Sequence, residues 1–407
     1  MKRFNDFFRC MSPLVLFMLF FSTTDVSAMK SNGPAADGHD SIRISLLTCA
    51  PGEEIYSLFG HTAIRYENPS QGIDVVFNYG LFSFNTPNFI LRFSLGETDY
   101  QLGATDYAHF AAEYAFFGRS VWQQTLNLTE REKAELIRLL QENYRPENRV
   151  YRYNFFYDNC ATRPRDKIEE SIAGKVIYPA KPQDGSRSFR DIVHQYCKGH
   201  PWARFGIDLC IGSEADRPIT QRQMMFAPFY LMDAFAGAQI ENDSIQRPLA
   251  EAARLIVDAT PGTDESGWIF TPLQCALLLF ILTVGATIYG IRRRTGLWGV
   301  DLFLFSAAGI VGCALAFLAS FSEHPAVSSN FLLLVFHPGQ LLFLPYIVYC
   351  VRKGKKCWYL TLNLVVLTLF IVLFPAIPQR FDFAVVPLAL VLLIRSASNL
   401  IVTSKKK

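Results

Sequence analysis

A cysteine that stands directly before a predicted helix is the clearest sign of chemistry in this sequence. Residues 151–174 read as an aromatic-rich extended segment that breaks at Asp158-Asn159, and a helix is predicted to start at Cys160. Asp or Asn at this position is the usual N-cap. The first-turn N–H groups and the positive end of the helix dipole favour a thiolate. We therefore expect Cys160 to ionise easily and act as a nucleophile; the alternative is a structural cysteine.

His61 is the residue best suited to take the proton from that thiol. It follows Gly60 at the start of a predicted strand and precedes Cys160 by about a hundred residues, so only the fold can bring the two together. A thiol at a helix start that faces a His on an antiparallel strand is a known catalytic arrangement. Asn78, on the paired strand, is predicted to hold the His61 ring. Asp74 is the alternative, because the strand register decides between them.

Three further residues are predicted to contact a substrate. Asn159 would cap the helix and lend a donor beside the thiol. Arg65 and Arg163 carry guanidinium groups, which suit phosphate oxygens, so we expect one of them to meet a substrate phosphate; the alternative is a structural or solvated role. No spacing of His, Cys, Asp or Glu indicates a metal site, and no cofactor is expected.

The chain up to residue 265 has the pattern of a mixed domain of strands and helices. Two of its strands flank a turn and predict an antiparallel hairpin. Thr129 and Glu132 form a capping box that opens a helix with one apolar face. Residues 88–95 fit a helix or a strand equally well. The predicted strands are residues 42–49, 61–67, 73–79 and 120–128.

The chain after Trp268 is dominated by apolar runs, each near the length that spans a bilayer as a helix. Basic clusters follow the first, third and fifth runs, and the positive-inside rule places these clusters in the cytoplasm. The C-terminus is then cytoplasmic, and the preceding domain lies on the other side of the membrane. The five runs are residues 269–291, 300–321, 331–351, 358–374 and 383–402.

The N-terminus agrees with this topology. Residues 1–28 contain basic residues, a short apolar core and small residues before a cleavage site, which is typical of a secretory signal peptide. The predicted domains are therefore the signal peptide (1–28), an exported domain (29–265) and a five-span domain (266–407). The formal net charge of +3 gives no sign of nucleic-acid binding.

Four cysteines lie in the predicted exported domain, where an oxidising environment permits disulfides. Cys197 and Cys210 bracket a short loop and are predicted to form one. Cys49 and Cys160 remain, and a disulfide between them would argue against a catalytic thiol.

Several strings carry a resemblance to known families. A His on a strand followed by an Asn-Cys pair at a helix start resembles the circularly permuted NlpC/P60 thiol enzymes, which include the lecithin:retinol acyltransferase type. The strings FGHTAIRY, FNYGLFSFNTPNF, NFFYDNCATRPRD and FGIDLCIGSEADR resemble the Lnb family more closely. In that family a periplasmic domain precedes a bundle of membrane spans. The resemblance implies an α+β, circularly permuted papain-like periplasmic domain followed by an all-α bundle of five transmembrane helices.

The Lnb family is implicated in lipoprotein N-acylation in Bacteroides-like bacteria. The resemblance therefore implies an inner-membrane acyltransferase in which Cys160 and His61 match the family's Cys and His. Its partners would be a phospholipid acyl donor and a diacylated lipoprotein acceptor. A second hypothesis is a membrane-anchored periplasmic cysteine peptidase or amidase that acts on cell-wall peptides. A third is a non-enzymatic scaffold with a structural Cys49–Cys160 disulfide.

Overall fold

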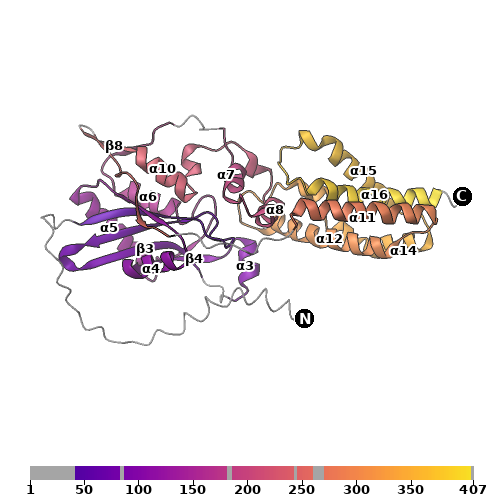
Figure 1. Cartoon of the computed structure of the whole chain (residues 1–407), viewed down its shortest axis with the longest axis horizontal. Coiled ribbons are helices and arrows are strands. Elements are labelled where there is room, and N and C mark those ends of the chain that lie inside the picture. Colours follow the sequence, from indigo (N-terminus) through magenta and orange to yellow (C-terminus); the bar gives the residue numbers. More distant parts are fainter. Residues whose placement is uncertain (1–41, 83–86, 181–185, 243–244, 260–269, 405–407) are drawn as a thin grey trace. The chain divides into compact units, whose positions relative to one another are not determined.

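A seven-stranded antiparallel sheet forms the centre of the N-terminal domain in the computed structural model of the protein (Figure 1). The structure describes residues 42–82, 87–180, 186–242, 245–259 and 270–404. The predicted signal peptide and the predicted boundary at residue 265 lie outside these ranges. Along the sheet the strands are β10 (Arg254–Val257), β5 (Val121–Thr125), β1 (Arg43–Cys49), β2 (His61–Asn68), β3 (Ile73–Leu81), β4 (Asp99–Asp106) and β6 (Val150–Arg152).

Helices cover both faces of this sheet, which is why the central strand β1 is buried almost throughout. Apolar side chains at alternating positions pack on one face with α5 (Glu130–Tyr144), α6 (Thr162–Ser171) and α10 (Pro228–Gly237). The intervening positions pack on the other face with α4 (Tyr107–Phe116). A second sheet consists of β7 (Lys175–Ile177), β8 (Gln239–Asn242) and β9 (Ile245–Pro248).

The predicted hairpin is confirmed, because β2 and β3 pair antiparallel around the short 3-10 turn η2 (Pro69–Gln71). The capping box at Thr129 is also present and opens α5. Residues 88–95, which fitted either structure, contain the short helix α3 (Phe89–Leu95). Residues 220–238, whose partly apolar pattern is typical of one longer helix, form two helices instead, since Pro228 separates α9 (Gln221–Met224) from α10.

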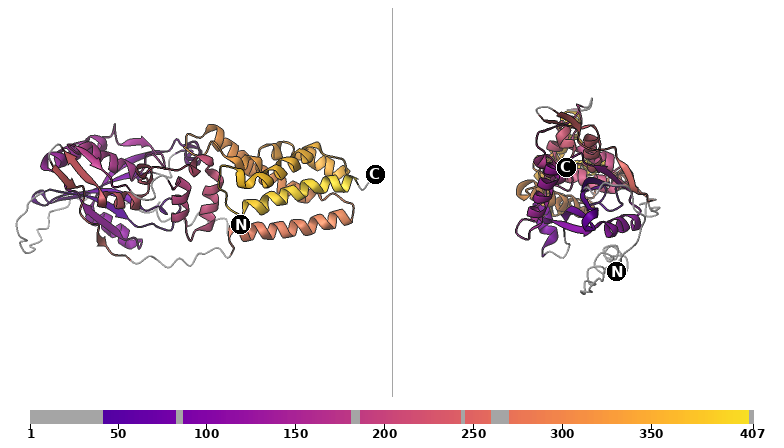
Figure 2. Two further views of the ribbon diagram at one scale, coloured as in Figure 1. Left: turned by 90° about the horizontal axis from the view of Figure 1, so that it is seen from above. Right: turned by 90° about the vertical axis from the view of Figure 1, so that its left-hand side faces the viewer.

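Four long apolar helices occupy four of the five predicted spans: α11 (Pro272–Arg292), α12 (Trp298–Phe321), α15 (Trp358–Leu373) and α16 (Val385–Ser404). Figures 1 and 2 show α11 and α16 side by side. The third predicted span is not one straight helix. Its two parts, 331–342 and 344–353, meet at 74°. They comprise η4 (Phe331–Leu334), α13 (Gly339–Leu342) and α14 (Leu344–Lys353). Pro338 separates η4 from α13, and Pro345 in the first turn of α14 explains why α13 does not continue into it.

A buried ion pair links two of the spans. Arg395 of α16 is 2% exposed and donates to both carboxylate oxygens of Asp301 on α12, at 2.7 and 3.0 Å. Thr287 of α11 accepts a further hydrogen bond from the same guanidinium. A charge inside a bilayer needs such partners, so this contact fixes the packing of three helices.

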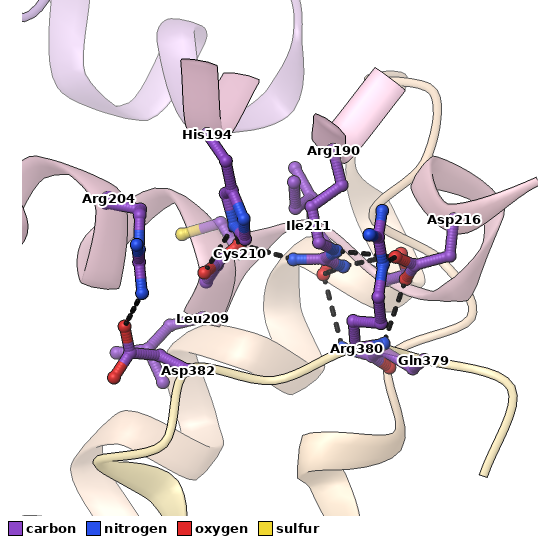
Figure 3. Close-up of polar contacts among 12 residues, drawn as sticks. Arg190, His194, Arg204, Leu209, Cys210, Ile211, Asp216, Gln379, Arg380 and Asp382 are labelled. Carbon is purple, nitrogen blue, oxygen red and sulfur yellow. Dashed lines mark hydrogen bonds and ion pairs between the residues drawn. The ribbon is translucent and has the colours of Figure 1, made fainter. Parts of the chain in front are cut away.

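Charged residues also connect the N-terminal domain to a loop between α15 and α16 (Figure 3). Arg380 of this loop pairs with Asp191 at 2.6 Å and with Asp216 at 2.9 Å. Arg204 pairs with Asp382 of the same loop at 3.1 Å. The partners come from α7 (Phe189–Tyr196), α8 (Pro201–Cys210) and the 3-10 helix η3 (Ser213–Asp216). One compact unit accordingly takes in residues 41–407.

Candidate functional site

His61 is the first residue of β2, and its ring is held by Asn78 of β3. Nε2 of His61 lies 3.2 Å from Oδ1 of Asn78, so the predicted contact is present. Because an amide oxygen only accepts, Nε2 carries the proton and Nδ1 is the basic nitrogen. Gly60 permits this strand start: its φ is +80°, and a Cβ there would lie 2.6 Å from the carbonyl oxygen of Cys49. Asp74, the alternative, pairs with Arg65 instead.

The turn before α6 presents Cys160 to the sheet. The helix begins at Thr162, two residues later than predicted, because Oδ1 of Asn159 accepts from the backbone N–H groups of Ala161 and Thr162 at 2.8 and 3.0 Å. Asn159 thus provides the expected cap, but it forms a turn that leaves Cys160 outside the helix. Within the described residues, the N–H of Cys160 bonds to no other residue and faces its own sulfur.

The thiol of Cys160 lies over the β2–β3 pair beside His61. Its sulfur is within hydrogen-bonding reach of the backbone of Thr62, the next residue after His61. On the neighbouring strand, a Cβ built on Gly80 would lie 3.5 Å from that of Cys160, an ordinary van der Waals distance, so Cys160 packs directly against β3. Thiol and imidazole form no hydrogen bond with each other in the part of the chain that the structure describes. The fold nevertheless brings the predicted Cys–His–Asn set to one place.

Both groups are uncharged at neutral pH. Burial raises the pKa of the Cys160 thiol to about 11, against an ordinary value of 9.0. Burial also lowers the pKa of His61 from 6.5 to about 4, helped by the positive charge of Arg119. The expectation of an easily ionised thiol is therefore wrong for this state, because loss of hydration outweighs the N–H groups near the sulfur. A neutral imidazole, however, is ready to accept a proton.

Arg119 is a functional candidate that sequence reasoning missed. Its positive charge lowers the pKa of Cys160, Cys49 and His61 together, which favours a thiolate beside a neutral imidazole. The side chain is fixed by a hydrogen bond from Nε to the carbonyl oxygen of Ala50 at 2.8 Å. One of its terminal nitrogens is buried without a hydrogen-bond partner in the described structure. No motif marks this arginine, since it lies in the short connection between α4 and β5.

Three tyrosines surround the thiol and were also missed. Ionised Cys160 would raise the pKa of Tyr100, Tyr151 and Tyr153, which places all three rings near the sulfur. The hydroxyl of Tyr151 is buried and makes no hydrogen bond among the described residues. The aromatic-rich segment before Cys160 was a signal for these residues, because two of them belong to it.

The residues predicted to bind a substrate are occupied by protein partners. Arg65 donates to Asp74 at 2.8 and 2.7 Å and to Gln123 at 2.8 Å, and it stacks over the ring of Tyr107. All three nitrogens of the guanidinium donate to protein partners, so we infer that Arg65 stabilises the sheet and does not bind a substrate.

Asn159 and Arg163 are likewise engaged beside the thiol. The amide nitrogen of Asn159 donates to the carbonyl oxygens of Phe155 and Phe226 at 2.8 and 2.9 Å. Arg163 forms a bidentate pair with Asp158 at 2.6 and 2.7 Å and stacks over Tyr151. These contacts position the Cys160 turn and leave no free donor on Asn159 for a substrate.

All four cysteines of this domain have free thiols, so the predicted Cys197–Cys210 disulfide is absent. Cys197 precedes α8, whereas Cys210 is its last residue, and a ten-residue helix is about 15 Å long. A disulfide requires Cα atoms within about 7 Å. Cys49 lies opposite His61 in the β1–β2 register. Cys49 and Cys160 form no disulfide, so the bond on which the hypothesis of a non-enzymatic scaffold depends is absent.

The sheet domain with its Cys–His pair and the long apolar helices define a multi-pass membrane protein with a large domain outside the bilayer. Residues 35–189 match the Lnb N-terminal periplasmic domain, and residues 264–407 match the Lnb transmembrane domain. The chain belongs to the Lnb family, and its N-terminal domain is periplasmic. No curated protein and no solved structure matches it.

Proposed function

We propose that the protein transfers a fatty acyl chain from a phospholipid to the N-terminal amine of diacylglyceryl-cysteine lipoproteins. The observation that carries this proposal is a free Cys160 thiol against the backbone of Thr62, beside the His61–Asn78 pair. The domain is part of a membrane protein of the Lnb family, which supports lipids as substrates. More spans than tethering requires count against a cell-wall peptidase or amidase.

The first step would load the enzyme. Nδ1 of His61 takes the proton of the Cys160 thiol as sulfur attacks the carbonyl carbon of a phospholipid ester. A C–S bond forms and the C–O bond to glycerol breaks. His61 then returns the proton to the departing glycerol oxygen, which leaves a lysophospholipid and an acyl-thioester on Cys160.

The second step would unload it. The neutral α-amine of the lipoprotein attacks the thioester carbonyl, so a C–N bond forms and the C–S bond breaks. His61 takes the proton released by the amine and passes it to the departing sulfur, which restores the thiol. Water must be excluded while the thioester persists, or the net reaction is phospholipid hydrolysis.

Two donors would stabilise the oxyanion of each step. The N–H of Cys160 has no other residue as its partner among those described, and the Tyr151 hydroxyl is buried and unpaired near the sulfur. Donors fixed in advance at a developing negative charge contribute strongly to catalysis. Asn78 would keep Nδ1 of His61 directed as a base.

We further infer a circularly permuted papain-like core, since the His strand precedes the Cys turn along the chain. The basic clusters after the first and third apolar runs support a cytoplasmic C-terminus in the bacterial inner membrane.

Mass spectrometry of lipoprotein N-terminal peptides tests the function in a host that lacks its own lipoprotein N-acyltransferase. The wild-type gene should yield triacylated peptides, whereas Cys160→Ser and His61→Ala should leave diacylated ones. Cys197→Ser is the matched control, because this buried thiol belongs to a core cluster that contains neither Cys160 nor His61. Triacylated peptides from the Cys160→Ser strain would refute the proposal, and release of muropeptides by the purified protein would favour the peptidase alternative.

A further inference from the structure

The short helix α3 presents apolar side chains to its surroundings although it belongs to a folded domain. Ile90 is 80% exposed, Leu91 52% and Phe93 50%. None of its seven residues is buried. Three large apolar side chains next to one another on a short helix are unusual on a surface that faces only water.

Four contacts fix α3 to the end of the membrane span α12. The N–H of Glu323 donates to the carbonyl oxygen of Leu95 at 2.8 Å, and Nε2 of His324 lies 2.8 Å from the carbonyl oxygen of Phe93. The rings of Phe93 and His324 are 5.7 Å apart. A Cβ built on Gly96 would lie 3.0 Å from the backbone nitrogen of His324, so the two backbones approach closely.

These contacts set the height of α3 relative to the bilayer. Glu323 follows the last residue of α12, Phe321, by two positions, which is at most about 7 Å of chain. The polar layer on each side of the hydrocarbon core is about 5–7 Å thick. Apolar side chains on a helix at this height are typical of elements that lie in the membrane interface.

A row of aromatic rings leads from α3 toward the thiol. Each ring lies close to the next, and an ionised Cys160 would act on the last two rings. Phe93 is exposed, Phe89 and Phe82 are partly exposed and Tyr100 is buried, so the row leads from the surface of α3 into the domain, and its flat apolar rings suit contact with a hydrocarbon chain. The successive centroid distances are 6.0 Å for Phe93–Phe89, 5.9 Å for Phe89–Phe82, 5.0 Å for Phe82–Tyr100 and 4.1 Å for Tyr100–Tyr153.

We propose that α3 lies in the interfacial layer of the outer leaflet and that the aromatic row guides a phospholipid acyl chain from there to Cys160. The occupant of the exposed face is therefore lipid, not a second protein. The position of α3 stands on the contacts with Glu323 and His324. The route to Cys160 rests on the proposed acyl transfer.

Photo-crosslinking tests the position of α3 without any catalysis. Benzoylphenylalanine replaces Ile90 in the full chain in phosphatidylethanolamine nanodiscs, and lipid adducts are measured by mass spectrometry after illumination. Ile73 is the matched control: it is also an exposed isoleucine (37%), but it lies at the hairpin end of β3. We expect about tenfold more lipid adduct at position 90 than at position 73, because only position 90 would lie in the membrane interface. Equal yields, or none at either position, would overturn the proposal.

A double variant, Ile90→Ser with Leu91→Ser, tests the route. Thioester formation on Cys160 from nanodisc phospholipid should fall about tenfold, because two apolar contacts with the leaflet are lost. Thioester formation from water-soluble p-nitrophenyl butyrate should stay within about twofold of wild type, since this ester needs no leaflet. If the double variant loses thioester formation with both the phospholipid and the water-soluble ester, or with neither of them, the proposed route is contradicted. If wild-type Cys160 forms no thioester with either donor while position 90 still crosslinks to lipid, acyl transfer fails and the membrane position of α3 stands.

Discussion

The ionisation state of Cys160 is open to a direct measurement. With a pKa of about 11, only about one thiol in ten thousand is ionised at pH 7, against about one in a hundred at its ordinary value of 9.0. Because the thiolate is the species that reacts with iodoacetamide, the native thiol should react about a hundredfold more slowly than in the unfolded protein at pH 7. The rate should rise about tenfold per pH unit up to pH 10.

The assay is carboxamidomethylation of the full-length protein in nanodiscs from pH 5 to 10, followed by mass spectrometry of the Cys160 peptide. His61 has a pKa of about 4, so its ring bears no charge over this range and His61→Ala should leave the slope unchanged. A rate that is flat from pH 5 to 8 and collapses in His61→Ala would reveal a thiolate–imidazolium pair. That result would refute the neutral resting state.

Four further outcomes are expected. Arg119→Gln should raise the pKa of Cys160 and slow its alkylation at every pH up to 10, because a nearby positive charge is lost; an unchanged profile would place Arg119 outside the site. Asn159→Ala should lower the free energy of unfolding by about 2–4 kcal/mol in denaturant titrations, as it removes a cap and leaves two carbonyl oxygens unpaired. Cys197→Ser combined with Cys210→Ser should leave the melting temperature within a few degrees of wild type under non-reducing conditions, since no disulfide is lost; a large drop would indicate one. Between pH 6.5 and 4 the unfolded chain protonates His61 and the folded protein does not, so acidification should cost about 2–3 kcal/mol, and His61→Gln should reduce this loss in melts at both pH values.

Local patterns in the sequence predicted those parts of the molecule that local physics controls. Alternation and a turn gave the β2–β3 hairpin, and this hairpin alone is enough to bring Asn78 to His61. Apolar runs predicted four of the five spans, because a bilayer imposes the length of a helix that crosses it, whereas the bend in the third run was not predicted. Thr129 and Glu132 satisfied each other as a capping box within four residues of chain.

The remaining features depend on contacts between distant segments. The raised pKa of Cys160 follows from its deep burial between α6 and the sheet. A position at the start of a helix does not predict this burial. Arg119 and Tyr100 reach the thiol from other parts of the domain, so their distance from Cys160 along the sequence does not predict that they lie near it. The Cys197–Cys210 pairing was inferred from a short separation, but α8 fills that separation as a rigid rod.

The ion pair between Arg395 and Asp301 has a consequence for biogenesis. Arg395 stands within the last span, where a lone arginine costs about 2.5–3.5 kcal/mol during insertion. Its partners Asp301 and Thr287 belong to the first two spans, which leave the ribosome earlier. We therefore expect α16 to enter the bilayer most readily when α11 and α12 have already been inserted. Insertion of α16 thus includes a step of helix recognition, and a chain that lacks Asp301 should insert this helix less completely.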